Sequence, residues 1–273
     1  MKTIGILYHP KLSEGKPLAD KLAKKLRAYG QSPWVCSAWE EQTARSKLDG
    51  TDMVIAIGGD GTILRASRLV LTQDVPIVGI NMGRLGFMTE MTADEVDHNL
   101  PLLLEGKGWL DKRAMLQATL TRSGRVFHAL NDVVIGRGAI ARVISIEVKV
   151  DGVPFTTYRA DAVILASATG STAYSLAAGG PVLHPQSQDI LLQPLACHLG
   201  PSYGLIFPEN VTLQIEVESR HQAILNIDGQ SNLPLENNEI IEVKHSPHVT
   251  SFLRMKPPTG AFYGTLAQRL AGK

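Results

Sequence analysis

The chain has 273 residues, of which 27 are Lys or Arg and 26 are Asp or Glu, so its formal net charge is +1. This balance disfavours nucleic acid or an anionic membrane surface as the main partner. Hydrophobic residues make up 44% of the chain, enough for one large domain or two modest ones. Two cysteines cannot staple a secreted fold, and neither a signal peptide nor a membrane-spanning run is evident. We therefore expect a cytoplasmic protein.

Strand and helix signals alternate in the N-terminal part of the chain. Short apolar runs predict strands at 3–8, 53–57 and 75–80, and helical periodicity predicts helices at 16–29, 63–71 and 92–105. The last of these helices opens with Thr-Ala-Asp-Glu, which has the form of a capping box. Strands that alternate with helices predict a parallel, doubly wound α/β domain, to which we assign residues 1–113.

From about residue 114 the apolar residues recur at every second position, as they do in half-buried strands. Asp151 and Gly152 separate two such runs and predict a hairpin, because a type I′ turn needs positive φ at both central residues. Further strands are predicted at 211–217, 223–227 and 240–244. We therefore expect a mostly antiparallel, β-rich domain at 114–250. The segment 251–273 follows it, with a helix at 263–270 that packs back on the first domain.

A glycine-rich turn, Gly-Gly-Asp-Gly-Thr at 58–62, joins a predicted strand to a predicted helix. Glycines let several backbone N–H groups converge on a phosphate, and the helix N-terminus adds a favourable dipole. The negative charge of Asp60 would repel a phosphate, so its presence needs a reason. We interpret Asp60 as the group that accepts a proton from an attacking hydroxyl or as a ligand that helps to hold Mg²⁺. The alternative is an ordinary tight turn in which Asp60 caps the helix.

Two more polar segments adjoin predicted buried strands. Residues 168–175, Ala-Thr-Gly-Ser-Thr-Ala-Tyr-Ser, follow the apolar run 162–166 and offer hydroxyls and an aromatic ring to a phosphate or a base. Asn131 and Asp132 precede an apolar run; an amide suits an adenine edge, and a carboxylate suits a ribose diol. Both segments also have ordinary interpretations, as a polar loop with Ser/Thr turns and as an Asn-Asp turn.

These motifs, in this order, resemble those of the bacterial-type NAD kinases. Residues 79–88, Gly-Ile-Asn-Met-Gly-Arg-Leu-Gly-Phe-Met, are similar to a further signature of that family, and the segment 261–270 is similar to its terminal helix. The resemblance covers essentially the whole chain and is most specific at 169–174. The glycine turn alone is shared in form with diacylglycerol-type lipid kinases and phosphofructokinases.

The resemblance implies ATP-dependent phosphorylation of the 2′-hydroxyl on the adenosine ribose of NAD⁺, with Asp60 as the general base. It also implies Mg²⁺ bound mainly through the ATP phosphates without a dedicated protein metal site, a crevice between two domains as the active site, and a homodimer or homotetramer. The implied binding residues are Gly58, Gly59, Gly61, Thr62, Arg65, Phe87, Asn131, Asp132, Arg159, Asp161, Thr169, Ser171, Thr172, Ala173, Tyr174 and Ser175. A lipid kinase of the same superfamily and a non-catalytic NAD(P)-binding regulator stay open as alternatives.

The segment 159–162, Arg-Ala-Asp-Ala, resembles an Arg-Gly-Asp-Gly motif of the family. By this resemblance Asp161 faces the nicotinamide end of the substrate, and Arg159 approaches the new 2′-phosphate from its own or a neighbouring subunit. The alternatives are a turn residue for Asp161 and a solvated charge at a strand end for Arg159. The chain departs from the family pattern at Ala160 and Ala162, which replace glycines, and at Tyr203, which replaces an arginine.

Overall fold

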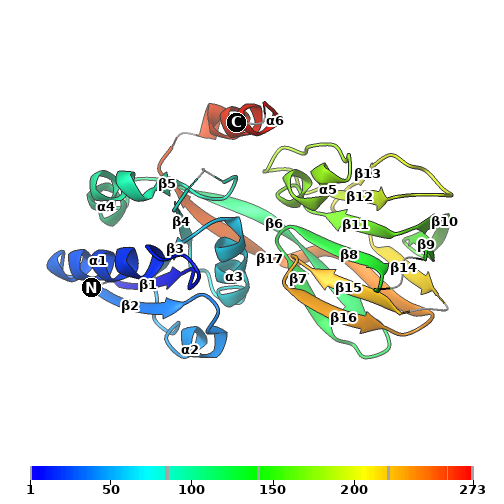
Figure 1. Cartoon of the computed structure of the whole chain (residues 1–273), viewed down its shortest axis with the longest axis horizontal. Helices are drawn as coiled ribbons and strands as arrows, with labels where there is room; N and C mark the ends of the chain where they lie inside the picture. Colours follow the sequence, from blue (N-terminus) through cyan, green and yellow to red (C-terminus); the bar gives the residue numbers. More distant parts are fainter. Residues whose placement is uncertain (1, 84–85, 140–141, 220–221, 257, 272–273) are drawn as a thin grey trace. The chain divides into compact units, whose positions relative to one another are not determined.

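The computed structural model describes residues 2–83, 86–139, 142–219, 222–256 and 258–271. The chain divides into two compact units (Figure 1). Unit 1 comprises residues 1–112 and 250–273, and unit 2 comprises residues 113–249. Two long strands, β6 (Trp109–Leu120) and β17 (Glu239–Arg254), contribute residues to both units. In the described ranges, no helix has the length and apolar character needed to cross a membrane.

Unit 1 is built on a parallel sheet with the strand order β2-β1-β3-β4. Its strands are β1 (Thr3–Tyr8), β2 (Ser32–Ser37), β3 (Met53–Ile57), β4 (Ile77–Asn81) and the short β5 (Met91–Thr92). Its helices are α1 (Gly15–Ala28), α2 (Glu41–Arg45), α3 (Asp60–Leu69), the 3₁₀ turn η1 (Ala93–Glu95), α4 (Val96–Leu104) and α6 (Pro258–Leu270).

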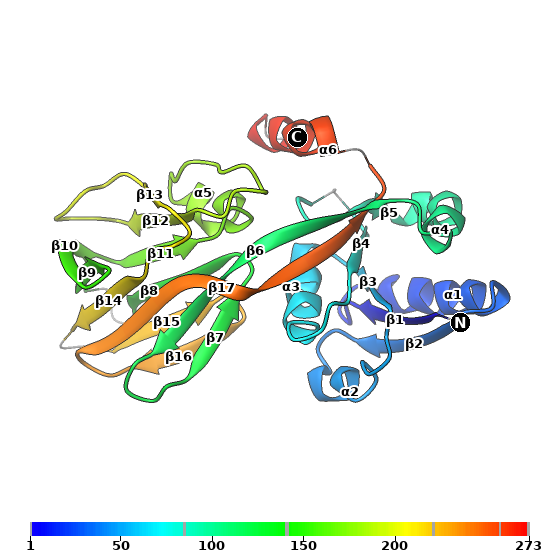
Figure 2. The same cartoon turned by 180° about the vertical axis from the view of Figure 1, so that it is seen from behind.

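Helices cover both faces of this sheet because its strands carry apolar side chains on both sides. Ile55 and Val78 pack with α1 and α4 in one cluster. The next residue along β4, Gly79, points to the other face, where a Cβ would lie 2.6 Å from Ile63 Cδ1 of α3. Figures 1 and 2 show α1 and α2 on opposite sides of β1 and β2. The prediction of a doubly wound α/β domain is confirmed.

Some predicted bounds differ from the observed ones. Strands β1 and β3 have the predicted bounds, and the capping box is present, with Thr92 N donating to Glu95 Oε2 at 2.8 Å. Helix α3 begins at Asp60 rather than residue 63 because Gly59, with extended backbone, takes the N-cap position. Helix α6 begins at Pro258, a residue favoured in the first helical turn.

Unit 2 consists of antiparallel strands in two sheets. One sheet has the order β13-β12-β11-β8-β15-β16, and the other contains β10-β9-β14-β17 and the hairpin β6–β7. The further elements are β7 (Val126–Ala129), β8 (Asp132–Arg137), β9 (Ile144–Val150), β10 (Val153–Ala160), β11 (Ala162–Ala166), η2 (Gly170–Thr172), α5 (Tyr174–Ala177), β12 (Ile190–Leu195), β13 (Leu205–Phe207), β14 (Leu213–Glu218), β15 (Ala223–Ile227) and β16 (Ser231–Leu235).

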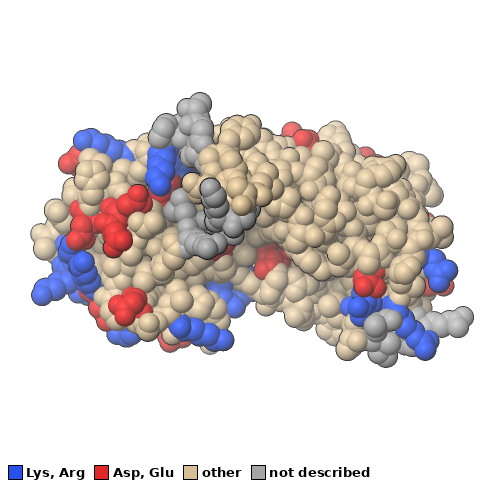
Figure 3. Space-filling model, turned by 45° about the horizontal axis from the view of Figure 1, so that its top comes forward, with Lys and Arg blue, Asp and Glu red and all other residues tan. Residues whose placement is uncertain are grey.

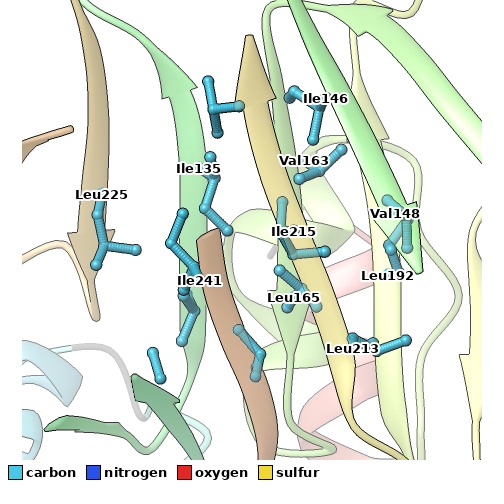
Figure 4. Close-up of a cluster of buried hydrophobic side chains, with 14 of the residues drawn as sticks. Ile135, Ile146, Val148, Val163, Leu165, Leu192, Leu213, Ile215, Leu225 and Ile241 are labelled. Carbon is cyan, nitrogen blue, oxygen red and sulfur yellow. The ribbon is translucent and has the colours of Figure 1, made fainter. Parts of the chain in front are cut away.

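The inward side chains of these two sheets form one core. Ile135 and Val163 come from one sheet, Ile146 and Ile215 come from the other, and all four are fully buried (Figure 4). The hairpin between β9 and β10 turns at Asp151, with φ of 50°, and the following glycine, with φ of 81°, as a type I′ turn requires. The prediction of a mostly antiparallel, β-rich second domain is confirmed.

Charged side chains are mixed in sign on the face shown in Figure 3. Basic and acidic groups alternate over unit 1, and most of unit 2 on that face is uncharged. Among the described residues on this face, the basic groups therefore form no stripe of the kind that tracks a nucleic acid backbone.

Candidate nucleotide site

The glycine turn of unit 1 connects the carboxyl end of β3 to the start of α3. A Cβ at Gly58 would lie 2.3 Å from Thr62 Oγ1, so close packing requires glycine there. At Gly59 and Gly61, by contrast, a Cβ would meet open space, and neither residue has positive φ. Internal packing therefore does not explain these two glycines. An approaching ligand would, because it needs the space that a side chain would fill.

The first turn of α3 presents polar groups that suit an anion. Thr62 is fully buried, and its hydroxyl has no hydrogen-bond partner in the described structure. The dipole of a helix favours a negative charge at its N-terminal end, although the amides of Thr62 and Ile63 already donate to the carbonyl of Gly59. A phosphate group placed at this end would be stabilised by the dipole.

Asp60 is the first residue of α3, and a second loop approaches its carboxylate. The carboxylate accepts hydrogen bonds from Phe87 N at 3.3 Å and Met88 N at 3.2 Å. A Cβ at Gly86 would lie 2.2 Å from Asp60 Oδ1, so this approach needs glycine. Arg84 and Leu85 of the same motif lie outside the described residues. Gly59 holds the N-cap position of α3 and Asp60 is its first residue, so the interpretation of Asp60 as the helix cap is wrong.

The remaining unit 1 candidates point in different directions. The ring of Phe87 lies 6.3 Å from that of Phe262 in α6, centroid to centroid. The guanidinium of Arg65 lies over the ring of Trp39 at 4.2 Å. Trp39 is not one of the predicted site residues, yet it contacts one of them.

A cavity of about 580 Å³ lies within unit 2, a size that suits a small organic ligand. Five of the predicted site residues line it, although they come from three separate segments of the sequence. These residues are Asn131, Asp132, Asp161, Ala173 and Tyr174. The lining also includes Arg137, Asn226, Asp228 and Asn232, which sequence reasoning did not place in the site.

Asp228 fixes the backbone of the segment that carries Asn131 and Asp132. Its carboxylate accepts hydrogen bonds from the amides of Leu130 at 2.9 Å, Asn131 at 2.7 Å and Asp132 at 3.1 Å. Asp228 occupies the turn between β15 and β16 with φ of 52°, and Gly229 follows with φ of 66°. An Asp-Gly pair after a predicted strand is a recognisable turn signal, so the turn could have been found from the sequence.

The cavity holds two polar groups that a ligand could satisfy. Burial, together with the neighbouring Asp228, raises the pKa of Asp132 to about 7. The side-chain oxygen of Asn131 is buried and has no hydrogen-bond partner in the described structure. Buried polar atoms are normally hydrogen-bonded, so the side-chain oxygen of Asn131 favours a ligand that brings a hydrogen-bond donor.

Asp161 forms an ion pair inside the cavity lining. Its Oδ1 lies 3.0 Å from Arg137 Nε, and its carbonyl accepts a hydrogen bond from Arg137 N at 2.9 Å. The two side chains are about a third exposed, at 31% and 29%. Arg137 therefore orients the carboxylate of Asp161, which lines the cavity in addition to its place in a turn.

Most hydroxyls of the segment 168–175 bond within the protein. Ser171 is fully buried, and its hydroxyl donates to the carbonyl of Ala168 at 2.7 Å. Thr172 Oγ1 donates to the carbonyl of Thr169 at 3.0 Å. The hydroxyl of Thr169 accepts a hydrogen bond from Arg113 Nη1 at 3.3 Å. These bonds shape the loop and give the three hydroxyls partners in the protein itself.

The same segment packs tightly on Asn131. A Cβ at Gly170 would lie only 2.0 Å from the carbonyl oxygen of Asn131, so only glycine fits. Tyr174 is 44% exposed and lines the cavity together with Ala173. The hydroxyl of Ser175 is buried and has no partner in the part of the chain that the structure describes.

Arg159 lies apart from this cavity. It is exposed on β10, and its amide donates to the carbonyl of Leu199 at 2.9 Å. The three departures from the family pattern have different surroundings. Ala160 is fully buried in the core, Ala162 lines the cavity, and Tyr203 is 65% exposed.

Unit 1 thus offers an anion-binding turn beside a carboxylate, and unit 2 offers a polar cavity of nucleoside size. This combination is typical of an enzyme that transfers phosphoryl groups between nucleotides. The model of the ATP-NAD kinase N-terminal domain matches residues 4–108, and that of the ATP-NAD kinase C-terminal domain matches residues 130–255. The chain belongs to the ATP-NAD kinase family, which confirms the resemblance drawn from the motifs.

Near-full-length relatives agree with this assignment. The NAD kinase of Dehalococcoides mccartyi strain CBDB1 is 41% identical over 275 residues, which cover 99% of this chain and 96% of the relative. The NAD kinase of Chloroflexus aurantiacus strain J-10-fl is 37% identical over 273 residues, which cover 99% of each chain. These relatives give no support to a lipid kinase or a non-catalytic regulator.

Two solved structures share the fold. The crystal structure of yeast NADH kinase complexed with NADH has a TM-score of 0.88 and 22% identity, covering 99% of this chain and 88% of that one. The structure of an NAD kinase from Archaeoglobus fulgidus in complex with ATP has a TM-score of 0.79 and 22% identity, covering 98% of this chain and 99% of that one.

Proposed function

We propose that this chain is an enzyme that phosphorylates NAD⁺ with ATP, at the 2′-hydroxyl of the adenosine ribose, to give NADP⁺. Relatives named NAD kinase that match nearly the whole chain support the reaction. The observation that carries the site assignment is the position of the Asp60 carboxylate. It lies at the start of α3, accepts hydrogen bonds from the amides of Phe87 and Met88, and adjoins glycines that packing does not require.

In this proposal the donor phosphates lie on the N-terminal turn of α3. The ribose oxygen forms a bond to the terminal phosphorus of ATP while the bond from that phosphorus to the bridging oxygen breaks, and ADP leaves. The proton of the hydroxyl passes to the carboxylate of Asp60. The amides of Phe87 and Met88 orient this carboxylate and leave lone pairs for the proton.

We propose that Mg²⁺ enters with ATP. Among the described residues, no group of three or more His, Cys, Asp or Glu side chains could hold a metal ion. Mg²⁺ commonly keeps several waters and binds substrate phosphates with one or two carboxylates, so the residues present fit a metal carried by the nucleotide. When bound, it would neutralise the charge of the phosphates. Asp60 is the one carboxylate within the glycine turn itself.

We assign the cavity of unit 2 to the acceptor nucleotide. The buried oxygen of Asn131 can accept a hydrogen bond from the amino group of adenine, and Asp132 can accept hydrogen bonds from ribose hydroxyls. The ring of Tyr174 offers a face to the base. Asp161, oriented by Arg137, is proposed to face the nicotinamide end.

We also propose a cytoplasmic homodimer or homotetramer. Both cysteines are free, which fits a reducing compartment. Strands β10 and β13 lie at sheet edges, and large apolar side chains are exposed on or near them: Val153, Phe155, Leu199, Tyr203 and Ile206. Such a surface suits a second copy of the chain. Light scattering gives the mass in solution, and a monomer at micromolar concentration would contradict this proposal.

The test supplies ATP, Mg²⁺ and NAD⁺ and detects NADP⁺ with an NADP-specific dehydrogenase. We expect Asp60→Asn to lower turnover by about 10²- to 10⁴-fold, because the general base is lost. Calorimetric titration should show unchanged NAD⁺ binding. Asp20→Asn is the matched control, since Asp20 forms only an exposed ion pair with Lys16. No NADP⁺ from the wild type would refute the function, and normal turnover by Asp60→Asn would refute the role of Asp60.

A further inference from the structure

The strand order of unit 1 identifies a second feature beside the glycine turn. Strand β1 lies between β2 and β3, so the connections after β1 and after β3 begin at one point of the sheet edge. In open parallel sheets, ligands bind at the carboxyl ends of strands where the order reverses. His9 follows β1, and its amide donates to the carbonyl of Ile57 at 3.0 Å. His9 therefore lies beside the glycine turn.

His9 belongs to a cluster with Trp39 and Arg65, which we call the aromatic cluster. The rings of His9 and Trp39 meet edge to face with centroids 4.4 Å apart, and the guanidinium of Arg65 lies 4.2 Å from the ring centroid of Trp39. A Cβ at Gly58 would lie 3.2 Å from His9 Cβ, so the cluster adjoins the glycine turn. Trp39 follows β2 and is 39% exposed, which is unusual for a side chain of its size.

The charge of Arg65 indicates an anionic ligand. Arg68, nearly one helical turn further along α3, forms an ion pair with Glu41, and Arg45 pairs with the same carboxylate at 2.9 Å. Among the described residues, Arg65 has no carboxylate within ion-pair distance. Burial and the neighbouring Arg68 lower its pKa. Together with the unpartnered, buried hydroxyl of Thr62, this cation suits the phosphates of a nucleotide.

A hollow beside Trp39 can take the uncharged part of such a ligand. The hollow has a volume of about 600 Å³ and is lined by Trp39, residues 40–43 and Arg45. Glu40, Glu41 and Arg45 are all among the lining residues, and Glu41 is paired with Arg45 and Arg68. The lining therefore carries charges of both signs, whereas Arg65, the cation beside Trp39, has no ion pair among the described residues. An exposed indole also provides a surface on which a nucleobase can stack.

We propose that the aromatic cluster is the donor-nucleoside site. The base of the donor stacks against Trp39, Arg65 contacts its phosphates, and the terminal phosphate reaches the glycine turn. Trp39 thereby selects a nucleoside triphosphate over inorganic polyphosphate. This inference rests on the proposed function, because it names the donor that the same reaction uses.

The kinetic test compares Trp39→Ala and Trp39→Phe with the wild type in the NADP⁺ assay. We expect the KM for ATP to rise about tenfold in Trp39→Ala and to recover largely in Trp39→Phe. The KM for NAD⁺ and the inhibition constant of tripolyphosphate should stay unchanged, because neither ligand has a base at this site. Tyr29→Ala is the control, since Tyr29 is a 53% exposed aromatic residue of the same unit.

A binding test works without turnover. ATP added in the absence of NAD⁺ should quench the tryptophan fluorescence of the wild type, and Trp39→Phe should abolish this change. Suppose that the wild type makes NADP⁺, that the KM for ATP is the same in Trp39→Ala, and that ATP does not quench the fluorescence. The donor-site inference is then overturned, and the proposed function stands. An inhibition constant of tripolyphosphate that rises in Trp39→Ala as much as the KM for ATP also overturns the donor-site inference. If the wild type makes no NADP⁺, the proposed function fails, and the quenching still decides the binding site. Should Trp39→Ala fail to fold, the fluorescence of Trp39→Phe decides.

Discussion

Replacing Asp132 with asparagine removes an ionisable carboxyl from the cavity of unit 2 with little change of shape. Asp132 is 5% exposed, and burial together with Asp228 raises its pKa from 3.8 to about 7. Between these two values the folded chain keeps a proton that the unfolded chain releases. The stability that this proton contributes is fully present below about pH 4 and is lost as the pH rises through about 7. The loss is about 1.4 kcal/mol per pH unit and about 4 kcal/mol in total.

The assay is urea unfolding of both proteins without nucleotide at several values between about pH 5 and about pH 8. We expect the unfolding free energy of Asp132→Asn minus that of the wild type to grow by about 1.4 kcal/mol per pH unit up to about pH 7 and then to level off. Glu236→Gln is the control, because Glu236 is a 77% exposed partner of Arg122. A difference that stays constant over this range would refute the raised pKa of Asp132.

Two glycine substitutions separate packing from ligand approach. Gly170→Ala places a Cβ 2.0 Å from the carbonyl oxygen of Asn131. We therefore expect a lower melting temperature and a KM for NAD⁺ raised at least about tenfold. A melting temperature and a KM that both equal those of the wild type would show that the loop does not position Asn131. Gly59→Ala meets open space, so we expect an unchanged melting temperature and a KM for ATP raised about tenfold. An unchanged KM for ATP would contradict a phosphate at this position.

Much of the fold could be predicted because its buried strands are continuous apolar runs. Strands β3 and β11 are buried along their whole length, and their predicted bounds agree with the structure. Strand β2, Ser-Pro-Trp-Val-Cys-Ser, escaped prediction because it is half-buried over most of its length and lies at the edge of the sheet, where proline is tolerated. The order of the strands depends on pairings between distant segments, which local patterns do not encode.

The candidate site of unit 2 was only partly predictable for the same reason. Asn131 stands out as a polar residue before an apolar run, but the carboxylate that holds its backbone is 97 residues away in the sequence. The antiparallel register of β8 with β15 brings Asp228 to that position. Arg137 likewise reaches Asp161 only because β8 pairs with β11.

The proposed sites of the two units use different parts of the chain to face a ligand: backbone in unit 1 and side chains in unit 2. This difference determines how specifically the sequence indicates each site. In the site that we propose for unit 1 the phosphate lies on the backbone of the glycine turn, so the signal is glycine: Gly59 and Gly61 have no packing reason to lack a side chain. In unit 2 side chains form the site, and side chains of the same type also serve the structure. The hydroxyl of Ser171 is enclosed and bonded to Ala168, although its sequence context suits a phosphate equally well. Glycine that packing does not demand is therefore a more specific sign of a ligand than a run of hydroxyl residues.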